Sequence, residues 1–317
     1  MLVIRSKVLG FCMGVRRAVE LAAAEAERGV PVYTIGSLIH NPGVLSDLKK
    51  LGVQALGETP ENMENRSVII RAHGIEPRVE DDLRGRGARI VDATCPKVKA
   101  SQLKAESLSR AGYCLFLAGE GKHAEITGIL GYSARGYAEA ADATDANGAG
   151  NAGACSFIVN NAAEAQAAAK KLLNERPEAK TALIGQTTIS EEEYRAIGEE
   201  IKKYFPALEI VQTICAATAD RQQALREMLP DVDAVLIAGG RESANTQRLL
   251  AIAGAAASGH SRGSSSGNPR EGGKPCALVE SAGEIPAEFK TYRTVGLSAG
   301  ASTPDSVIDE IEKELLR

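Results

Sequence analysis

The segment RIVDATCPKVKASQLKAESLSRAGYCLFLAGEGKHAE, residues 89–125, decides the fold. An apolar stretch ends in a polar turn at Cys95, good helix formers follow, and a second apolar stretch, YCLFLAG, leads into a polar loop. The apolar stretches predict buried strands, and the segment between them predicts a helix with Val98, Ala105 and Leu108 on its apolar face. A strand, a helix and a strand in this order predict a right-handed βαβ unit in a parallel sheet.

The same pattern occurs three times, each time around one cysteine. VLGFCMGV precedes the helical run RRAVELAAAEAERG, and EIVQTICAAT precedes ADRQQALREML. A strand and a polar loop follow each helix, and a loop residue lies 28 residues after the cysteine in every copy. The pairs are Cys12 and His40, Cys95 and His123, and Cys215 and Ser243. Equal spacing in three separate segments indicates three copies of one β-Cys-α-β unit.

A second polar cluster ends a later strand of each unit, and these clusters contain His73, Thr187 and Ser302. Ligands of parallel α/β sheets bind beyond the carboxyl ends of the strands, where all of these residues are expected. We therefore predict an α/β fold of three similar βαβ-type domains with parallel sheets around a pseudo-threefold axis and a central metal-cluster cavity. The predicted domains are residues 13–95, 96–213, and 214–300 together with 1–12, followed by a C-terminal segment, 301–317.

Two low-complexity segments interrupt the pattern. Residues 138–154 and 258–275 are rich in Gly, Ser, Ala, Asn and Asp, and this composition predicts exposed, mobile loops. His260 lies in the second segment, and we assign it no role.

The bulk composition narrows the possible functions. The 317 residues are 44% hydrophobic and 25% charged, the balance of a globular protein, and the net charge is −4. A nucleic-acid-binding protein normally shows a basic face, and 4% aromatic residues without Trp give no base-stacking platform. No apolar run approaches the roughly 20 residues of a membrane span, and the N-terminus does not resemble a signal peptide. We expect a cytoplasmic protein without nucleic-acid or membrane partners.

Six cysteines in a reducing compartment are not expected to form a disulfide framework, and the absence of a CxxC pair disfavours a zinc ribbon. Three of them are interpreted as small core residues: Cys114, Cys155 and Cys276. The other three share the repeat, and the helix N-terminus after each favours its thiolate. Three converging thiolates, from Cys12, Cys95 and Cys215, predict a [4Fe–4S] cluster with one open iron. Zinc on three cysteines and one histidine is the competing metal site.

The polar loops suit an anion, because histidine, hydroxyl and amide groups can all donate hydrogen bonds to a diphosphate. No Walker A or GxGxxG nucleotide fingerprint occurs in a fitting context. Glu125, two residues after His123, is the one carboxylate of the set. We expect it to donate a proton to the reacting carbon or to the leaving oxygen.

Nine motifs together resemble one family, in the same order from residue 3 to the C-terminus. They are GFCMGVRRAVE, IHNPGV, RAHGIE, DATCPKV, GKHAEITG, GQTTIS, TICAATADRQ, SANTQRL and SAGASTPD. The chain is similar to 4-hydroxy-3-methylbut-2-enyl diphosphate reductase of the LytB type. The motifs are long and jointly specific, and only the two low-complexity segments fall outside the resemblance.

This resemblance implies an iron–sulfur oxidoreductase that ends the non-mevalonate (MEP/DXP) isoprenoid pathway. Such an enzyme converts its (E)-hydroxy-diphosphate substrate to isopentenyl and dimethylallyl diphosphate by two-electron reductive dehydroxylation. It implies one [4Fe–4S] cluster per chain, held by three Cys, and ferredoxin or flavodoxin as the electron donor. Glu125 would be catalytic. The residues that would bind the substrate are His40, His73, His123, Thr187, Ser243, Asn245 and Ser302.

The chain departs from the family pattern at two positions. Ala124 stands where the family has Pro between His and Glu, and this change leaves the backbone before Glu125 less fixed. Ala244 stands where the family has a second Ser in the third loop, so one hydroxyl for the diphosphate is lost. Two other classes stay open: a cluster-dependent lyase of the quinolinate synthase kind, which needs no electron donor, and a cluster-based sensor or structural zinc protein.

Overall fold

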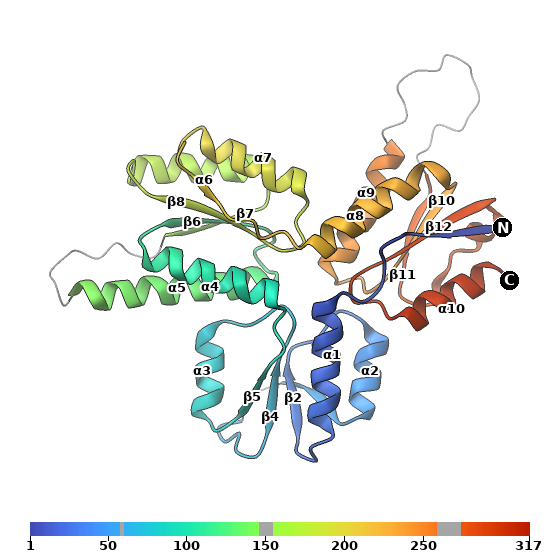
Figure 1. Ribbon diagram of the computed structural model, residues 1–317, viewed down its shortest axis with the longest axis horizontal. Coiled ribbons are helices and arrows are strands. Elements are labelled where there is room, and N and C mark those ends of the chain that lie inside the picture. Colours follow the sequence, from blue (N-terminus) through green and yellow to red (C-terminus); the bar gives the residue numbers. More distant parts are fainter. Residues whose placement is uncertain (58–59, 146–154, 259–273) are drawn as a thin grey trace. The chain divides into compact units, whose positions relative to one another are not determined.

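The structure, a computed structural model, describes residues 1–57, 60–145, 155–258 and 274–317. Over these residues it contains twelve strands and ten α-helices, and the strands form three separate four-stranded sheets (Figure 1). All strand pairs are parallel. The predicted fold class, α/β with three similar parallel-sheet domains, is confirmed. The pseudo-threefold axis and the domain boundaries stay predictions.

The first sheet along the chain has the strand order β3-β2-β4-β5. Its strands are β2 (Val32–Ile35), β3 (Val53–Leu56), β4 (Ser67–Ile70) and β5 (Arg89–Asp92). The helices of this part of the chain are α1 (Met13–Ala26), α2 (Pro42–Lys50) and α3 (Pro77–Gly85). β4 is buried on both faces, and Val68 packs with Met63 and Leu83. A central strand covered on both faces needs such a continuous apolar run.

The second sheet has the order β7-β6-β8-β9. Its strands are β6 (Cys114–Ala118), β7 (Ser156–Val159), β8 (Thr181–Gly185) and β9 (Glu209–Ile210). Its helices are α4 (Pro96–Arg110), α5 (Ala124–Asp145), α6 (Ala162–Glu175) and α7 (Glu191–Lys202). Successive residues of β6 face opposite ways, so Phe116 packs with α6 and α7 whereas Leu117 packs with α4 and α5 (Figure 1).

The third sheet has the order β1-β12-β10-β11 and joins the start of the chain to its end. Its strands are β1 (Leu2–Arg5), β10 (Ala234–Ala238), β11 (Cys276–Val279) and β12 (Thr294–Ala299). Its helices are α8 (Ala216–Met228), α9 (Ala244–Ser258) and α10 (Asp305–Leu315). Leu236 of β10 packs with the α10 residues Ile308 and Ile311, and Ile237 packs with α8 and α9.

Each cysteine of the repeat lies where the chain leaves one sheet and enters the next. Cys12, Cys95 and Cys215 follow the edge strands β1, β5 and β9, and the strand after the next helix belongs to a different sheet. The expectation that residues 89–125 form one βαβ unit of a single sheet is therefore wrong. The physical reason is packing: Ala105 and Leu108 of α4 bury their apolar face on the second sheet, which contains β6 but not β5.

The repeat extends to a glycine at the end of one strand in each copy. This glycine lies 24 residues after the cysteine and has a positive φ in all three copies. The three are Gly36 (φ 66°), Gly119 (φ 152°) and Gly239 (φ 147°). Residues with a side chain rarely adopt this conformation, so glycine permits the turn from the strand into the polar loop.

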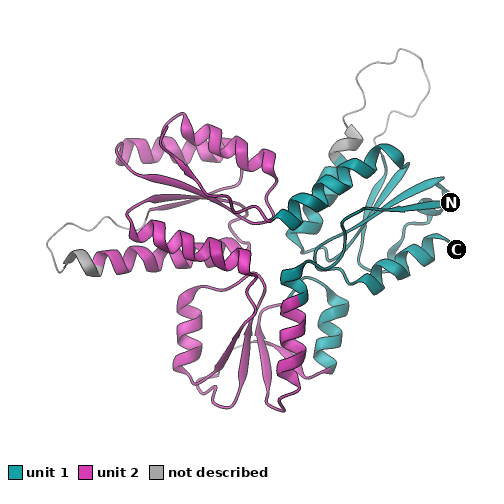
Figure 2. Ribbon diagram, viewed as in Figure 1, with its two compact units in different colours: residues 1–16, 39–50, 216–317 teal, residues 17–38, 51–215 magenta. Residues whose placement is uncertain are grey.

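By internal contacts the chain divides into two compact units, and the division falls within α1 (Figure 2). Unit 1 comprises residues 1–16, 39–50 and 216–317, and unit 2 comprises residues 17–38 and 51–215. The third sheet lies in unit 1, and the first and second sheets lie in unit 2.

Two loop expectations need correction. The low-complexity segment predicted at residues 138–154 begins as helix, because α5 continues to Asp145. Alanine is frequent in this stretch and is the strongest helix former, which the loop interpretation overlooked. Residues 146–154, and residues 259–273 with His260, lie outside the described residues. Among the helices that the structure describes, none is long and apolar enough to cross a membrane.

No disulfide framework forms among the described cysteines, but the interpretation of Cys114 and Cys155 as separate core thiols needs correction. Cys114 and Cys155 are bonded, with their Cα atoms 4.8 Å apart, and both side chains are buried as predicted for core residues. Both lie at the starts of adjacent parallel strands, since the residues after them, Leu115 and Ser156, are partners in the β6–β7 register. Composition cannot reveal such a pair, because it arises from strand register alone. Cys276 is half-buried, and burial raises the pKa of its thiol.

Candidate active site

Glu125 is the most tightly held of the predicted site residues in unit 2. It lies in the first turn of α5 and is 1% exposed. Its Oε1 accepts the backbone N–H of Thr187 at 2.7 Å, and its Oε2 accepts the Thr187 hydroxyl at 2.9 Å. Because Thr187 follows β8, these bonds fix the carboxyl at the carboxyl end of that strand.

The surroundings of Glu125 change its acidity. Burial raises the pKa of its carboxyl to about 7, and the two hydrogen bonds from Thr187 limit the rise. A carboxyl with a pKa near neutrality can hold a proton at physiological pH and still release it. This is the property that a proton donor needs, although the catalytic role itself stays a prediction.

His123 caps the helix that carries Glu125. Its Nδ1 accepts the Glu125 N–H at 3.2 Å, and its carbonyl accepts the Thr127 N–H at 3.0 Å. A neutral imidazole whose Nδ1 accepts a hydrogen bond has its proton on Nε2. The ring of His73 lies edge-on to that of His123, with the centroids 5.3 Å apart. Two predicted substrate-binding residues are therefore neighbours in unit 2.

The backbones of Cys95 and Cys215 are tied to the loops that carry these residues. The Cys95 N–H donates to the Ala72 carbonyl at 2.9 Å, directly before His73, and the Cys215 N–H donates to the Thr187 carbonyl at 3.0 Å. Cys95 is the N-cap of α4, and Pro96 occupies the first helical position as expected for a residue without an N–H.

Sequence reasoning assigned no role to two side chains that support these loops. Gln186 accepts the Glu120 N–H at 3.1 Å and donates to Thr188 Oγ1 at 2.8 Å, so it joins the loop before His123 to the loop after β8. Arg17 donates to the carbonyls of Asp92 and Thr94, at 3.2 and 3.4 Å, directly before Cys95. Gln186 lies in the GQTTIS motif and Arg17 lies in the GFCMGVRRAVE motif, but only the fold reveals their hydrogen-bond partners.

Unit 1 contains the remaining predicted substrate-binding residues. The Ser302 hydroxyl donates to the His40 carbonyl at 3.1 Å, which holds two of the polar loops together. A Cβ on Gly240 would clash with the same carbonyl, so glycine there permits the close approach. Nδ1 of His40 lies 3.8 Å from a carboxylate oxygen of Glu242.

Ser243 and Asn245 lie at the start of α9, with Ala244 between them. Ser243 Oγ accepts the Thr246 N–H at 3.4 Å. Asn245 is 5% exposed, and neither its Oδ1 nor its Nδ2 has a hydrogen-bond partner among the described residues. A buried polar group in this state costs about 1–3 kcal/mol, and a polar ligand would remove that cost. Asn245 is therefore suited to binding an anion or a hydroxyl.

Cys12 of unit 1 precedes a helix and forms a backbone hydrogen bond to a polar loop, as the other two cysteines do in unit 2. Its N–H donates to the Ala301 carbonyl at 3.1 Å, next to Ser302, and its Sγ accepts the Val15 N–H at 3.5 Å. Each cysteine thus precedes a helix and is bonded through its backbone to a loop that carries a predicted substrate-binding residue. This equivalence agrees with the threefold repeat inferred from spacing.

The donor set fits an iron–sulfur cluster, because all three cysteines are partly exposed thiols outside the disulfide, and soft thiolates suit such clusters. Over the described residues, no group of three or more His, Cys, Asp or Glu side chains is close enough to hold a metal ion. Cys12 belongs to unit 1, whereas Cys95 and Cys215 belong to unit 2, so their convergence stays a prediction.

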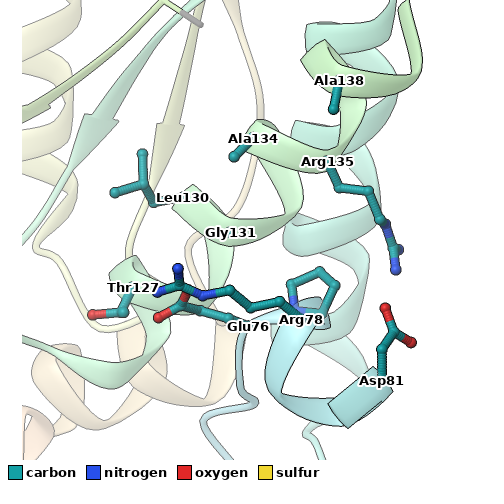
Figure 3. Close-up of a pocket in the computed structure, with 10 residues that line it drawn as sticks. Glu76, Arg78, Asp81, Thr127, Leu130, Gly131, Ala134, Arg135 and Ala138 are labelled. Atoms are coloured by element: carbon teal, nitrogen blue, oxygen red, sulfur yellow. The ribbon is translucent and has the colours of Figure 1, made fainter. Parts of the chain in front are cut away.

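A separate cavity of about 660 Å³ lies between α3 and α5 in unit 2 (Figure 3). Pro77, Leu130 and Ala134 contribute apolar surface, and the side chains of Arg78 and Arg135 also line it. Both cations are paired, with Glu76 and Glu106 respectively. None of the predicted site residues lines this cavity, so it is distinct from the candidate site.

Thiols at helix N-termini, a buried carboxyl of raised pKa and polar groups at strand ends are typical of an α/β enzyme with a metal and anion site. The family described as LytB protein matches residues 3–316. The chain belongs to the LytB family, and the resemblance inferred from its motifs is confirmed.

Relatives of this chain carry one enzyme name. 4-Hydroxy-3-methylbut-2-enyl diphosphate reductase of Treponema denticola is 40% identical over an alignment of 329 residues, gaps included. The alignment covers 100% of this chain and 99% of the relative. The enzyme of that name from Aquifex aeolicus is 37% identical, with coverage of 96% and 93%. The predicted enzyme class, an oxidoreductase of this kind, is confirmed.

Solved structures agree. A structure of (E)-4-hydroxy-3-methyl-but-2-enyl diphosphate reductase, described as the terminal enzyme of the non-mevalonate pathway, is 34% identical, has a TM-score of 0.65, and covers 100% of this chain and 99% of its own. The reductase from Plasmodium falciparum has a TM-score of 0.82 at 23% identity, with coverage of 100% and 88%, and supports the fold alone.

Proposed function

We propose that this chain reduces (E)-4-hydroxy-3-methylbut-2-enyl diphosphate to isopentenyl and dimethylallyl diphosphate, the last step of the non-mevalonate isoprenoid pathway. In this reaction the allylic C–O bond breaks, two electrons and two protons are taken up, and the hydroxyl leaves as water. The observation that carries the proposal is the Glu125 carboxyl, which is buried, has a pKa of about 7 and is held beside His123.

The proposed role of each side chain follows from its chemistry. Glu125 holds the proton that is delivered to the substrate, and Thr187 keeps the carboxyl in place through two hydrogen bonds. Imidazole, hydroxyl and amide donors hold the diphosphate, whose charge strengthens each hydrogen bond. These donors are His40, His73, His123, Ser243, Asn245 and Ser302.

We assign a [4Fe–4S] cluster to the three cysteines, with Cys12, Cys95 and Cys215 as ligands and one iron without a protein ligand. When bound, such a cluster supplies electrons and a Lewis-acid iron to the reaction. Support comes from the thiol donor set and from the equivalent position of each cysteine before a helix N-terminus.

We further propose ferredoxin or flavodoxin as the electron donor and the cytoplasm as the location. Cluster ligands must stay reduced, which favours a reducing compartment. The Cys114–Cys155 disulfide does not conflict with this location, because both sulfurs are buried and access limits exchange with small thiols.

The test is an anaerobic assay of the reconstituted protein with the hydroxy-diphosphate and reduced viologen. We expect product formation that requires the reductant; turnover without a reductant would favour a lyase instead. Serine variants of Cys12, Cys95 and Cys215 are each expected to lose iron, while Cys276→Ser keeps it. Zinc in place of iron and sulfide in the purified protein would overturn the cluster assignment.

A further inference from the structure

Gln102 of α4 is a buried polar residue for which the proposed reaction has no direct use. It is 1% exposed, and its Nε2 has no hydrogen-bond partner among the residues that the structure describes. Burial of such a donor is unfavourable, and native proteins contain few of them. The position of this amide therefore calls for an explanation.

The Gln102 amide lies between two segments that carry site residues. On one side is Gly74, directly after His73, where a Cβ would clash with Nε2 of Gln102. On the other side is Gly128, three residues after Glu125 in α5, where a Cβ would lie 2.7 Å from the same nitrogen. Only residues without a side chain allow both backbones to approach the amide this closely.

Two further glycines bring α5 close to its neighbours. A Cβ on Gly131 would lie 2.9 Å from Glu76 Cβ, beside the cavity of Figure 3, and a Cβ on Gly136 would clash with the carbonyl of Glu106 in α4. Glycine weakens a helix interior relative to alanine. Its repeated use in α5 indicates that close packing against α4 and against the segment after His73 outweighs helix propensity.

We propose that Gln102 is a positioning residue, whose side chain sets the separation between the segment after His73 and α5 at Gly128. The same separation fixes His73 against His123, whose rings are 5.3 Å apart, and the Nδ1 of His123 accepts the backbone N–H of Glu125. Gln102 touches none of the reacting groups in this account. The inference rests on the proposed function, because its consequence is a change in turnover of the diphosphate.

The test is a double-mutant cycle in the reconstituted full-length protein. Gln102→Ala removes the amide, Gly128→Ala pushes a methyl group against it, and the double variant places the methyl group in the vacated space. Gln102→Met keeps the length of the side chain without the amide. Gly85→Ala is the matched control, since Gly85 is also helical and has open space around its Cβ position.

We expect Gln102→Ala and Gly128→Ala each to lower kcat by about 10- to 100-fold, the size of effect that a misplacement of about 1 Å can have. The double variant and Gln102→Met recover most of that loss. Once α5 loosens, water reaches Glu125, so in Gln102→Ala the fall in activity at high pH moves to lower pH. A purely structural role would lower the melting temperature and leave kcat and this pH dependence unchanged.

The outcomes separate this inference from the proposed function. Wild-type protein and Gly85→Ala without turnover would contradict the proposed function itself. Active wild type with unchanged kcat in Gln102→Ala would overturn the positioning role. Two other results would also overturn it. In one, the loss of kcat in the double variant equals the product of the two single losses. In the other, Gln102→Met loses as much kcat as Gln102→Ala, which a role based on side-chain length does not allow.

Discussion

Asn245 of unit 1 and Glu125 of unit 2 differ in how the protein holds their polar side chains. In unit 2 the Glu125 carboxyl accepts two hydrogen bonds from Thr187, and its environment alters its acidity. In unit 1 both polar atoms of the Asn245 side chain are buried without a partner among the described residues. A carboxyl that the protein holds by two hydrogen bonds has a fixed position for proton transfer. A buried amide without a protein partner can instead form its hydrogen bonds with a ligand.

This difference suggests a division of labour within one reaction. Under the proposed function, unit 1 contributes most of the diphosphate donors, whereas unit 2 contributes the proton source Glu125 together with two further donors, His73 and His123. Of the three proposed cluster ligands, Cys12 lies in unit 1, and Cys95 and Cys215 lie in unit 2. The following predictions test this division, beginning with the largest expected effect.

The first prediction concerns the proton source in unit 2. Glu125→Gln keeps the shape of the side chain but cannot release a proton, so we expect kcat to fall about 10²- to 10⁴-fold with little change in KM. Steady-state kinetics with reduced viologen measure both constants. Glu120→Gln, at an exposed carboxylate in the preceding loop, is the control and should behave as wild type. Near-normal turnover of Glu125→Gln would exclude Glu125 as the proton donor.

The second prediction separates the stability of unit 2 from its chemistry. The Cys114–Cys155 disulfide joins residues 41 apart in sequence, and replacing both by Ser should lower the free energy of unfolding by about 2–4 kcal/mol. Anaerobic turnover should stay normal, because the bond lies in the core at the amino ends of β6 and β7. Urea unfolding with Cys276→Ser as the comparison measures the effect; an unchanged midpoint would contradict it.

The third prediction concerns binding in unit 1. Asn245→Ala removes an amide that we assign to the diphosphate, so KM should rise about 10- to 100-fold, since hydrogen bonds to charged groups contribute about 1.5–3 kcal/mol. The melting temperature should not fall, because the amide has no protein partner to lose among the described residues. A drop in melting temperature with an unchanged KM would assign Asn245 a structural role instead.

The fourth prediction is a shift in pH dependence. Under the proposed function the protonated form of Glu125 is the donor, so activity should fall as the pH rises through about 7. The Thr187 hydroxyl lowers the pKa of this carboxyl, and Thr187→Val should therefore raise the pKa and move the fall to higher pH. Profiles of kcat against pH measure this; a shift to lower pH, or none, would show that another group controls the fall.

Spacing alone revealed much of the fold and most of the candidate residues. The 28-residue distance from each cysteine to its loop predicted three equivalent units, because strand and helix lengths fix where the polar loops fall. The interpretation of residues 89–125 as one βαβ unit is wrong because the packing of α4 on β6 assigns this helix to the second sheet, whereas the predicted domain boundary after Cys95 does separate β5 from β6. Gln186 and Gln102 also escaped notice, because their partners are distant backbone groups.

The most direct test of the division of labour is calorimetric titration of inorganic diphosphate into wild type, Glu125→Gln and Asn245→Ala. We expect Glu125→Gln to bind diphosphate as wild type does and Asn245→Ala to bind it about tenfold or more weakly. Weakened binding in Glu125→Gln together with wild-type binding in Asn245→Ala would contradict it.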